Sequence, residues 1–313
     1  MKTCFLFPGQ GAQYAGMGQD LWQQSPRVKE IFQAASDCTG IDIRELLFHG
    51  SEEDLKSTDR TQIAITTVNL AASAFLKERG VTCDGVAGHS LGEYTALYEA
   101  GVIAFDDLFS LVKSRGEVMA EASNALRSEA GSAGMAAVLG LEYAKIEELC
   151  RSRLSEVYVA NHNSPTQIVL SGTAEGLAAA ERVCKEAGAK RIIPLKVSGP
   201  FHSPLIEAAR EAFARVIAGY RFSAPVLPVY SNVTGAAIGS GDEAKDLCVR
   251  QIVSTVKWVE DERAILADGF ERCIEAGPGK VLTGLWKSVS DTVRCHPAGT
   301  VELVEQLLGG SAS

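Results

Sequence analysis

A serine inside a glycine-flanked turn is the side chain of this sequence best suited to nucleophilic chemistry. Residues 88–92 read Gly-His-Ser-Leu-Gly, follow an apolar run at 81–87 and precede helix-forming residues at 93–100. In a strand-turn-helix setting this pattern forms a nucleophile elbow, which exposes the serine hydroxyl at the edge of a sheet. The pattern alone is common in a chain with 30 glycines, so the flanking elements are what favour a nucleophilic Ser90 over an ordinary turn.

A nucleophilic serine needs a base, and the chain has five histidines. We expect His202 to be that base, because residues 199–204 read Gly-Pro-Phe-His-Ser-Pro, a stiff turn that would fix the imidazole ring. His89 is expected to point away from Ser90 and to pack or hydrogen-bond beneath the turn. His296 stays an alternative, because an α/β-hydrolase places its catalytic histidine near the carboxyl end.

Acyl chemistry at a serine also needs donors for the oxyanion that forms on the acyl carbonyl. The helix that begins at Leu91 would direct its first amide groups and its dipole toward Ser90. Gln10 lies in Pro-Gly-Gln-Gly at 8–11, at the end of another predicted strand. Because the carboxyl ends of parallel strands meet at one edge, its amide is a candidate second donor, with an ordinary glycine turn as an equal alternative.

The elements around these residues alternate strands with helices, which predicts a mostly parallel sheet covered by helices on both faces. Apolar runs predict strands at 3–7, 81–87, 226–231 and 272–275. Helical periodicity and terminal glycines predict helices at 62–79, 93–100, 106–122, 204–219, 242–254 and 258–268, another that opens at 277–280, and a frayed tail at 309–313.

Residues 134–199 contain shorter predicted elements in the order β-α-β-β-α-β, which is the ferredoxin-like signature. Asn-Ser-Pro at 163–165 is expected to form the turn between the two middle strands. We therefore predict an α/β protein in which residues 1–130 and 200–313 form a large catalytic domain with an α/β-hydrolase-like core, and 131–199 a small ferredoxin-like insert. The pieces are strands at 135–141, 156–161, 167–172 and 191–197 and helices at 142–153 and 174–187.

Composition narrows the class of protein. The chain has 313 residues, of which 46% are hydrophobic, so it can bury a large core and is not intrinsically disordered. A formal charge of −9 has the wrong sign for wrapping nucleic acid or lying on anionic lipid. No long apolar window or signal-peptide core occurs, and the eight scattered cysteines form no metal-ligand pattern. We expect a cytoplasmic protein with reduced thiols and no metal.

Four segments resemble, in the same order, the motifs of malonyl-CoA:acyl carrier protein transacylases. This family includes the acyltransferase domains of fatty acid and polyketide synthases, and the matching segments span nearly the whole chain. They are Phe-Leu-Phe-Pro-Gly-Gln-Gly-Ala-Gln at 5–13, Gly-His-Ser-Leu-Gly-Glu-Tyr at 88–94, Gly-Pro-Phe-His-Ser-Pro at 199–204 and Ala-Gly-Pro-Gly-Lys-Val-Leu at 276–282.

The resemblance implies a ping-pong transfer of a malonyl group from malonyl-CoA to the phosphopantetheine thiol of an acyl carrier protein, without a cofactor. Ser90 would carry the malonyl group, His202 would act as the base, and the amides of Gln10 and Leu91 would form the oxyanion hole. Arg115 matches the arginine that pairs with the malonyl carboxylate, for which a planar bidentate cation is well suited. Without the resemblance, Arg115 would be read as an exposed helix residue.

Three further residues gain a role from the resemblance. Gln251 matches the glutamine whose carbonyl orients the histidine, and Asn163 matches an asparagine near the site. Phe201 resembles the malonyl-selective pattern, in which a bulky ring crowds an α-methyl group and discriminates by about 1–3 kcal/mol. The chain departs from the family at Thr255, where proline is usual, and at Gly199, where alanine is frequent.

Two other functions stay open from the sequence. A serine hydrolase would use the same elbow with water as the acceptor, and it could take His296 as its base. A binding domain would use Ser90 only as a turn residue. Carrier proteins are typically acidic, so a basic cluster is expected near the site entrance; Lys190, Arg191 and Lys196 are candidates, with a solvated strand edge as an equal alternative.

Overall fold

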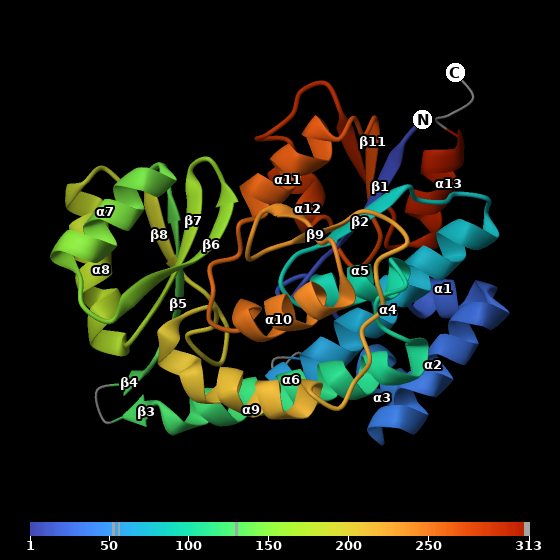
Figure 1. Ribbon diagram of the computed structural model, residues 1–313, viewed down its shortest axis with the longest axis horizontal. Coiled ribbons are helices and arrows are strands. Elements are labelled where there is room, and N and C mark those ends of the chain that lie inside the picture. The colour runs from blue at the N-terminus through green and yellow to red at the C-terminus, as the bar shows by residue number, and fades with distance from the viewer. Residues whose placement is uncertain (52–53, 56, 129–130, 310–313) are drawn as a thin grey trace.

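The computed structural model of this protein describes residues 1–51, 54–55, 57–128 and 131–309. Figure 1 shows two bodies, a larger one built on a central sheet and a smaller one formed by a second sheet and the helices beside it. A frayed tail is predicted at 309–313, but Gly309 is the last residue of a helix. Residues 310–313 lie outside the described residues. Residues 129–130, at the predicted boundary between the domains, also lie outside them.

The central sheet of the described chain has six strands in the order β10-β9-β2-β1-β11-β12. All neighbours are parallel except the edge strand β10, which is antiparallel to β9. The central strand β1 is buried at every position, as expected for a parallel strand covered on both faces. The strands are β1 (Thr3–Phe7), β2 (Gly85–Gly88), β9 (Val229–Ser231), β10 (Ala236–Ala237), β11 (Arg272–Glu275) and β12 (Arg294–Pro297).

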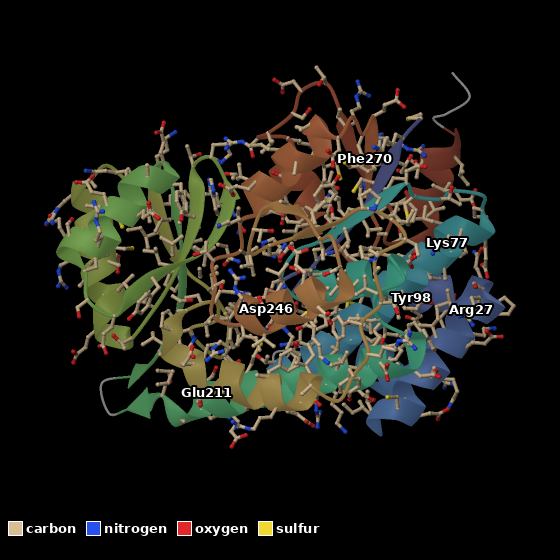
Figure 2. The ribbon with its side chains drawn as sticks, viewed as in Figure 1. Arg27, Lys77, Tyr98, Glu211, Asp246 and Phe270 are labelled. Atoms are coloured by element: carbon tan, nitrogen blue, oxygen red, sulfur yellow. The ribbon has the colours of Figure 1, made fainter. Side chains whose placement is uncertain are left out.

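Helices cover this sheet, and α4 is the most deeply buried of the long ones. Residues on all sides of α4 are buried because α2, α5 and α6 pack around it. In contrast, α9 and α10 present charged residues such as Glu211 and Asp246 to solvent (Figure 2). The helices are α1 (Gln19–Gln24), α2 (Pro26–Thr39), α3 (Ile43–Phe48), α4 (Thr58–Glu78), α5 (Gly92–Glu99), α6 (Phe105–Ala125), the 3-10 turn η1 (Pro204–Ile206), α9 (Glu207–Ile217), α10 (Gly241–Gln251), α11 (Trp258–Ala267), α12 (Val281–Trp286) and α13 (Val301–Gly309).

The smaller body is a four-stranded sheet in the order β6-β7-β5-β8, with every neighbouring pair antiparallel. Two helices pack on it through a separate apolar core that includes Val138, Ile146 and Ile168. Two short antiparallel strands, β3 and β4, precede it along the chain. The elements are β3 (Arg127–Ser128), β4 (Gly131–Ser132), β5 (Gly134–Leu139), α7 (Tyr143–Arg153), β6 (Val157–Ser164), β7 (Gln167–Gly172), α8 (Ala174–Glu186) and β8 (Arg191–Pro194).

A turn connects the two middle strands as predicted, but of the predicted residues 163–165 only Pro165 belongs to it. Asn163 and Ser164 belong to β6, and the turn consists of Pro165 and Thr166 alone, because Ser164 pairs with Gln167 across a two-residue hairpin. The β6–β7 register shifts between His162 and Ser164, so the ladder is irregular at Asn163. Such irregularities re-aim a side chain. Asn163 therefore lines a pocket from a strand and not from a loop.

The two bodies are joined by main-chain hydrogen bonds at the edge of β6. Val256 donates its N–H to Ala160 O at 2.8 Å and accepts from His162 N at 2.9 Å. Thr255 donates its hydroxyl to Val159 O at 2.7 Å. A proline at 255 would have no hydroxyl, so this departure from the family pattern gives the chain a direct link between the two bodies.

The second departure, Gly199, is explained by close packing against α6. A Cβ at position 199 would lie 1.9 Å from Ser123 Oγ and 2.5 Å from Ser123 Cβ. Both contacts are shorter than real Cβ atoms show, and rotating the hydroxyl would not relieve the second. The close contact between these positions therefore requires a glycine at 199 when a serine stands at 123.

We expect Gly199→Ala to lower the free energy of unfolding by about 1–3 kcal/mol through overpacking. Adding Ser123→Gly should restore part of that loss, because it removes both clashing atoms. Chemical denaturation of the two single variants and the double variant measures the coupling. Purely additive losses would contradict this packing account.

Candidate active site

Ser90 lies on a sharp turn between β2 and α5. Its φ is 51°, a left-handed conformation that costs an L-residue about 1–2 kcal/mol. The flanking glycines make the turn sterically allowed: a Cβ at Gly88 would lie 2.0 Å from the Gly92 carbonyl carbon, and one at Gly92 would lie 2.0 Å from Phe7 O. The Gly-x-Ser-x-Gly spacing is thus a packing requirement of this elbow.

The hydroxyl of Ser90 lies in hydrogen-bonding reach of His202, although 112 positions separate them in the chain. Ser90 Oγ and His202 Nε2 are 2.7 Å apart, and His202 Nδ1 is 2.8 Å from the main-chain carbonyl of Gln251. A carbonyl only accepts, so Nδ1 must carry a proton, and in a neutral ring Nε2 is then the acceptor for the serine hydroxyl. The structure thus brings together a nucleophile, a base and an orienting group.

His202 is only 4% exposed. Burial, and then the positive charge of Arg115, lowers the pKa of His202 to about 3. The ring is consequently neutral, and able to accept a proton, across the physiological pH range.

The rate of Ser90 acylation should stay nearly constant from pH 8 down to about pH 5. The base is active only when neutral, and its lowered pKa moves the acid limb far below the usual histidine midpoint near 6.5. Rapid-quench measurements of acylation across this range test the expectation. Burial also raises the pKa of Glu93 to about 7, so Glu93→Gln is the control. A fall in the acylation rate with a midpoint near pH 6.5 that persists in Glu93→Gln would contradict the lowered pKa of His202.

Arg115 projects from α6 into the same site and is 1% exposed, so the expectation of an exposed helix residue is wrong. The reason is that α6 packs against α4 and α9, which buries the face carrying Arg115. Its Nη1 donates to Gln62 Oε1 at 2.8 Å, and its Nη2 to Gln251 Oε1 at 2.9 Å and Ser90 Oγ at 3.4 Å. Among the described residues it forms no ion pair within 4.0 Å.

Gln251 connects the parts of the site through both its main chain and its side chain. Its carbonyl orients the His202 ring, while its side-chain oxygen binds Arg115. Its Nε2 donates to Ser90 O at 3.0 Å and to Glu93 Oε2 at 2.7 Å. One buried amide therefore fixes the guanidinium relative to the nucleophile.

A pocket of about 110 Å³ opens in front of Ser90. Every predicted site residue except Gln251 contributes to its lining, and Gln251 is bonded to the lining residues Arg115 and His202. His89 binds Asn163 Oδ1 through its Nε2 at 2.8 Å and packs edge-on against Trp258, so it does not compete for the Ser90 hydroxyl. The lining residues are Gln10, His89, Ser90, Leu91, Arg115, Met119, Met135, Asn161, Asn163, Val169, Leu195, Val197, Phe201 and His202.

His296 is not positioned to act on Ser90. It lies within β12 at the edge of the central sheet, and β1 and β11 separate that strand from β2. Three strand spacings of about 4.8 Å each put the two strands about 14 Å apart. The hydrolase arrangement with His296 as the base is therefore wrong.

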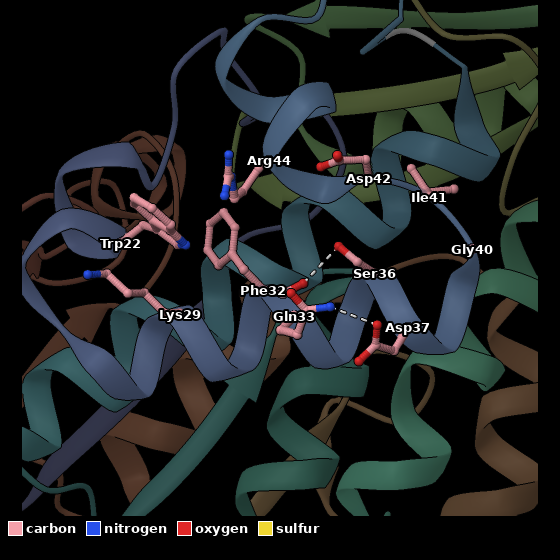
Figure 3. Close-up of a pocket in the computed structure, with 10 residues that line it drawn as sticks. All are labelled: Trp22, Lys29, Phe32, Gln33, Ser36, Asp37, Gly40, Ile41, Asp42 and Arg44. Carbon is pink, nitrogen blue, oxygen red and sulfur yellow. Dashed lines mark hydrogen bonds between the residues drawn. The ribbon is translucent and has the colours of Figure 1, made fainter.

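A larger hollow, of about 440 Å³, lies beside α2 and α3 (Figure 3). Lys29 and Arg44 place their charged groups 5.0 and 5.1 Å from a ring centroid of Trp22. The ten residues that line the hollow include no histidine or cysteine. The smaller pocket at Ser90 is therefore the one equipped for acyl chemistry.

Within the described part of the chain, no cluster of three or more potential metal ligands occurs, and all eight cysteines are free. The same residues include no helix with the length and apolar character needed to cross a membrane.

Sequence reasoning missed two buried amides of the site. Gln62 holds Arg115 from α4, and Asn232 holds the elbow from the end of β9. Gln62 shares one helix face with the polar residues Thr66, Asn69 and Ser73, so nothing in the sequence indicates that it is buried, and Asn232 stands only in an unspecific Asn-x-Thr pattern. Their partners are distant in sequence, which hides their roles.

A family model described as "Acyl transferase domain" matches residues 4–307. The chain belongs to this acyl transferase family. A malonyl CoA-acyl carrier protein transacylase of Bacillus subtilis is 40% identical over 98% of this chain and 97% of its own. The resemblance predicted from the sequence is thus confirmed.

Two solved structures of acyl transferases support the same relationship. An acyl carrier protein S-malonyltransferase of Vibrio cholerae has a TM-score of 0.92 and 39% identity, with 98% of this chain and 100% of that chain covered. A malonyl-transacylase solved in complex with its type II polyketide synthase acyl-carrier protein has a TM-score of 0.92 and 36% identity, with 99% and 100% covered. The chain therefore has their α/β fold.

Proposed function

We propose that this acyl transferase moves a malonyl group from malonyl-CoA to the phosphopantetheine thiol of an acyl carrier protein. The observation that carries the proposal is a buried guanidinium without an ion-pair partner among the described residues, 3.4 Å from the hydroxyl of a serine bound to a neutral histidine. A buried cation strongly favours a ligand that brings an anion. The names of the relatives point to the same substrates.

In the first half-reaction, Ser90 Oγ attacks the thioester carbonyl carbon of malonyl-CoA and its proton moves to His202 Nε2. The carbonyl oxygen becomes an oxyanion, for which the amides of Gln10 and Leu91 serve as donors. Collapse of this intermediate breaks the carbon–sulfur bond, and the coenzyme A sulfur takes the proton from His202. The product is a malonyl ester on Ser90.

In the second half-reaction, the carrier thiol gives its proton to His202 and its sulfur attacks the ester carbonyl. Collapse breaks the bond to Ser90 Oγ, and the proton on Nε2 returns to that oxygen. The two half-reactions use the same groups in reverse order, so one compact site serves both thioesters without a metal or cofactor.

Arg115 and Phe201 would select the acyl group. The guanidinium would bind the malonyl carboxylate while Gln62 and Gln251 hold it in place. Phe201 is buried and lines the pocket, where its ring would crowd an α-methyl group. Asn163 also lines the pocket, where its side-chain oxygen is bonded to His89.

The carrier protein would approach the mouth of the pocket next to Lys196. Leu195 and Val197 line the pocket, and Lys196 between them is exposed. Lys190 and Arg191 lie at the other end of β8, and the Lys190 stem packs against Gly140. Of the three candidate cations, Lys196 is the best placed for an acidic partner.

We further propose that residues 1–130 and 200–313 act as one catalytic domain with an α/β-hydrolase-like core, and that 131–199 form a ferredoxin-like insert. The strand order β6-β7-β5-β8 with helices after the first and third strands in sequence supports the insert. A cytoplasmic location is part of the same proposal.

The proposal is tested by mass spectrometry after incubation with malonyl-CoA and removal of excess substrate. We expect a malonyl adduct on the peptide containing Ser90, no adduct in Ser90→Ala, and less adduct from acetyl-CoA or methylmalonyl-CoA. An active preparation that forms no adduct, or that prefers acetyl-CoA, would contradict the proposed substrate.

A further inference from the structure

Asn232 is a fully buried residue just beyond β9, directly beneath the nucleophile elbow. Its side-chain oxygen accepts from the Ser90 N–H at 2.6 Å, and its Nδ2 donates to Gly88 O at 2.8 Å. The donor and acceptor are both main-chain groups of fixed type, which determines the orientation of the amide without ambiguity. The side chain of Asn232 therefore hydrogen-bonds to the main chain on both sides of His89, at Gly88 and at Ser90.

These two hydrogen bonds lie just beyond the last residue pair of the β2–β9 ladder. The β2–β9 pairing runs through Val86 with Val229 and Ala87 with Tyr230. Beyond it the chain turns into the elbow, and the Gly88 carbonyl and Ser90 N–H have no partner in β9, although Gly88 still pairs with Phe7 of β1 on its other side. A planar carboxamide offers the same donor and acceptor as a peptide group, so the side chain of Asn232 replaces the missing strand.

We infer that Asn232 is a positioning residue for the acyl transfer, because it holds Ser90 in its left-handed conformation with the hydroxyl directed at His202. The inference rests on the proposed function in one respect: acylation of Ser90 by malonyl-CoA is the reaction in which the effect is measured. Asn232 is absent from the lining of the pocket, so its effect should fall on the chemical step and not on substrate binding.

Acidic groups around Asn232 make an amide necessary. Its Nδ2 also donates to Asp261 Oδ2 at 2.8 Å, and its main-chain N–H donates to Glu93 Oε2 at 3.1 Å. Glu93 lies on α5 and Asp261 on α11, and Arg115 is connected to Glu93 through Gln251. An ionised carboxylate at 232 would have no proton for either Gly88 O or Asp261, whereas a neutral carboxylic acid would offer one acceptor and one donor.

The test is the pH dependence of Ser90 acylation in Asn232→Asp. At pH 8 we expect kcat for acylation by malonyl-CoA to fall about 10²-fold with KM little changed, as for a small misplacement of a reacting group. As the pH falls to 5.5 the rate should recover, because protonation of the introduced carboxyl restores a donor. Wild type should stay nearly constant over this range. Asn124→Asp, the same change at an exposed site on α6, is the matched control and should behave as wild type.

A fluorophosphonate probe separates this inference from the proposed substrate. It labels an activated serine without using malonyl recognition, so the labelling rate of Ser90 should show the same loss at pH 8 and recovery at pH 5.5. If wild type reacts with the probe but not with malonyl-CoA, the proposed function fails while the role of Asn232 can still be measured.

Thermal unfolding of every variant at both pH values establishes which are folded. If Asn232→Asp is unfolded at pH 8, Asn232→Ser replaces it, since the shorter serine side chain offers one polar atom where the amide offers two. We expect that variant to react about tenfold more slowly with both reagents. Folded Asp and Ser variants that react like wild type, or an Asp variant whose loss is independent of pH, would overturn the inference.

Discussion

Arg115→Ala is expected to lower the rate at which malonyl-CoA acylates Ser90 by about 10²- to 10³-fold. Removing one partner of a buried, hydrogen-bonded charge pair costs about 3–4 kcal/mol, and here the lost partner would bind the malonyl carboxylate. Acetyl-CoA brings no carboxylate, so its acylation rate should not fall in parallel. Single-turnover acylation with the two thioesters gives the ratio directly.

Arg115→Lys is the control for charge without geometry. Lysine keeps the positive charge but lacks the planar fork that reaches Gln62 and Gln251 together, so it should recover only a minor part of the malonyl rate. Thermal unfolding shows whether either variant is destabilised. Equal losses for malonyl-CoA and acetyl-CoA in a folded Arg115→Ala would mean that the guanidinium does not recognise the carboxylate.

His202→Ala is expected to reduce acylation by about 10³- to 10⁴-fold at pH 7. Ser90 Oγ has its hydrogen bond to His202 Nε2 at 2.7 Å, and without this acceptor no positioned base removes the hydroxyl proton. The adduct on the Ser90 peptide should then accumulate over hours and not within one rapid-quench time course.

His296→Ala removes the histidine that the hydrolase arrangement would use, and it serves as the matched control. It lies in the edge strand β12, so acylation should remain at the wild-type rate. A large loss in His296→Ala together with an active His202→Ala would reverse the assignment of the base.

Local sequence patterns predicted the parts of this fold that depend on local chemistry. The strand at 3–7 and the hairpin partner at 167–172 have the predicted bounds, because each is an apolar run between turn residues. The 81–87 strand begins only at Gly85, since the preceding residues form no ladder with β1 or β9. The short strand β12 was missed because four residues at a sheet edge leave little apolar signal.

The Ser90 elbow could likewise be predicted, since its glycines and its helix are local features. The burial of Arg115 could not, because a guanidinium on a helix face is ordinarily exposed and only the packing of α4 and α9 on α6 encloses it. The same holds for Asn232 and Gln62, whose partners come from other elements. Long-range hydrogen bonds of buried amides leave no periodic signal in one sequence.

The central claim is that the ester on Ser90 is an intermediate whose acyl group is passed to a thiol. It is tested most directly by isolating the malonyl-enzyme and mixing it with an acyl carrier protein that bears phosphopantetheine, or with the same protein without that group. We expect the malonyl group to leave Ser90 rapidly and appear on the phosphopantetheine thiol in the first mixture only. Release of free malonate at the same rate in both mixtures would contradict the account.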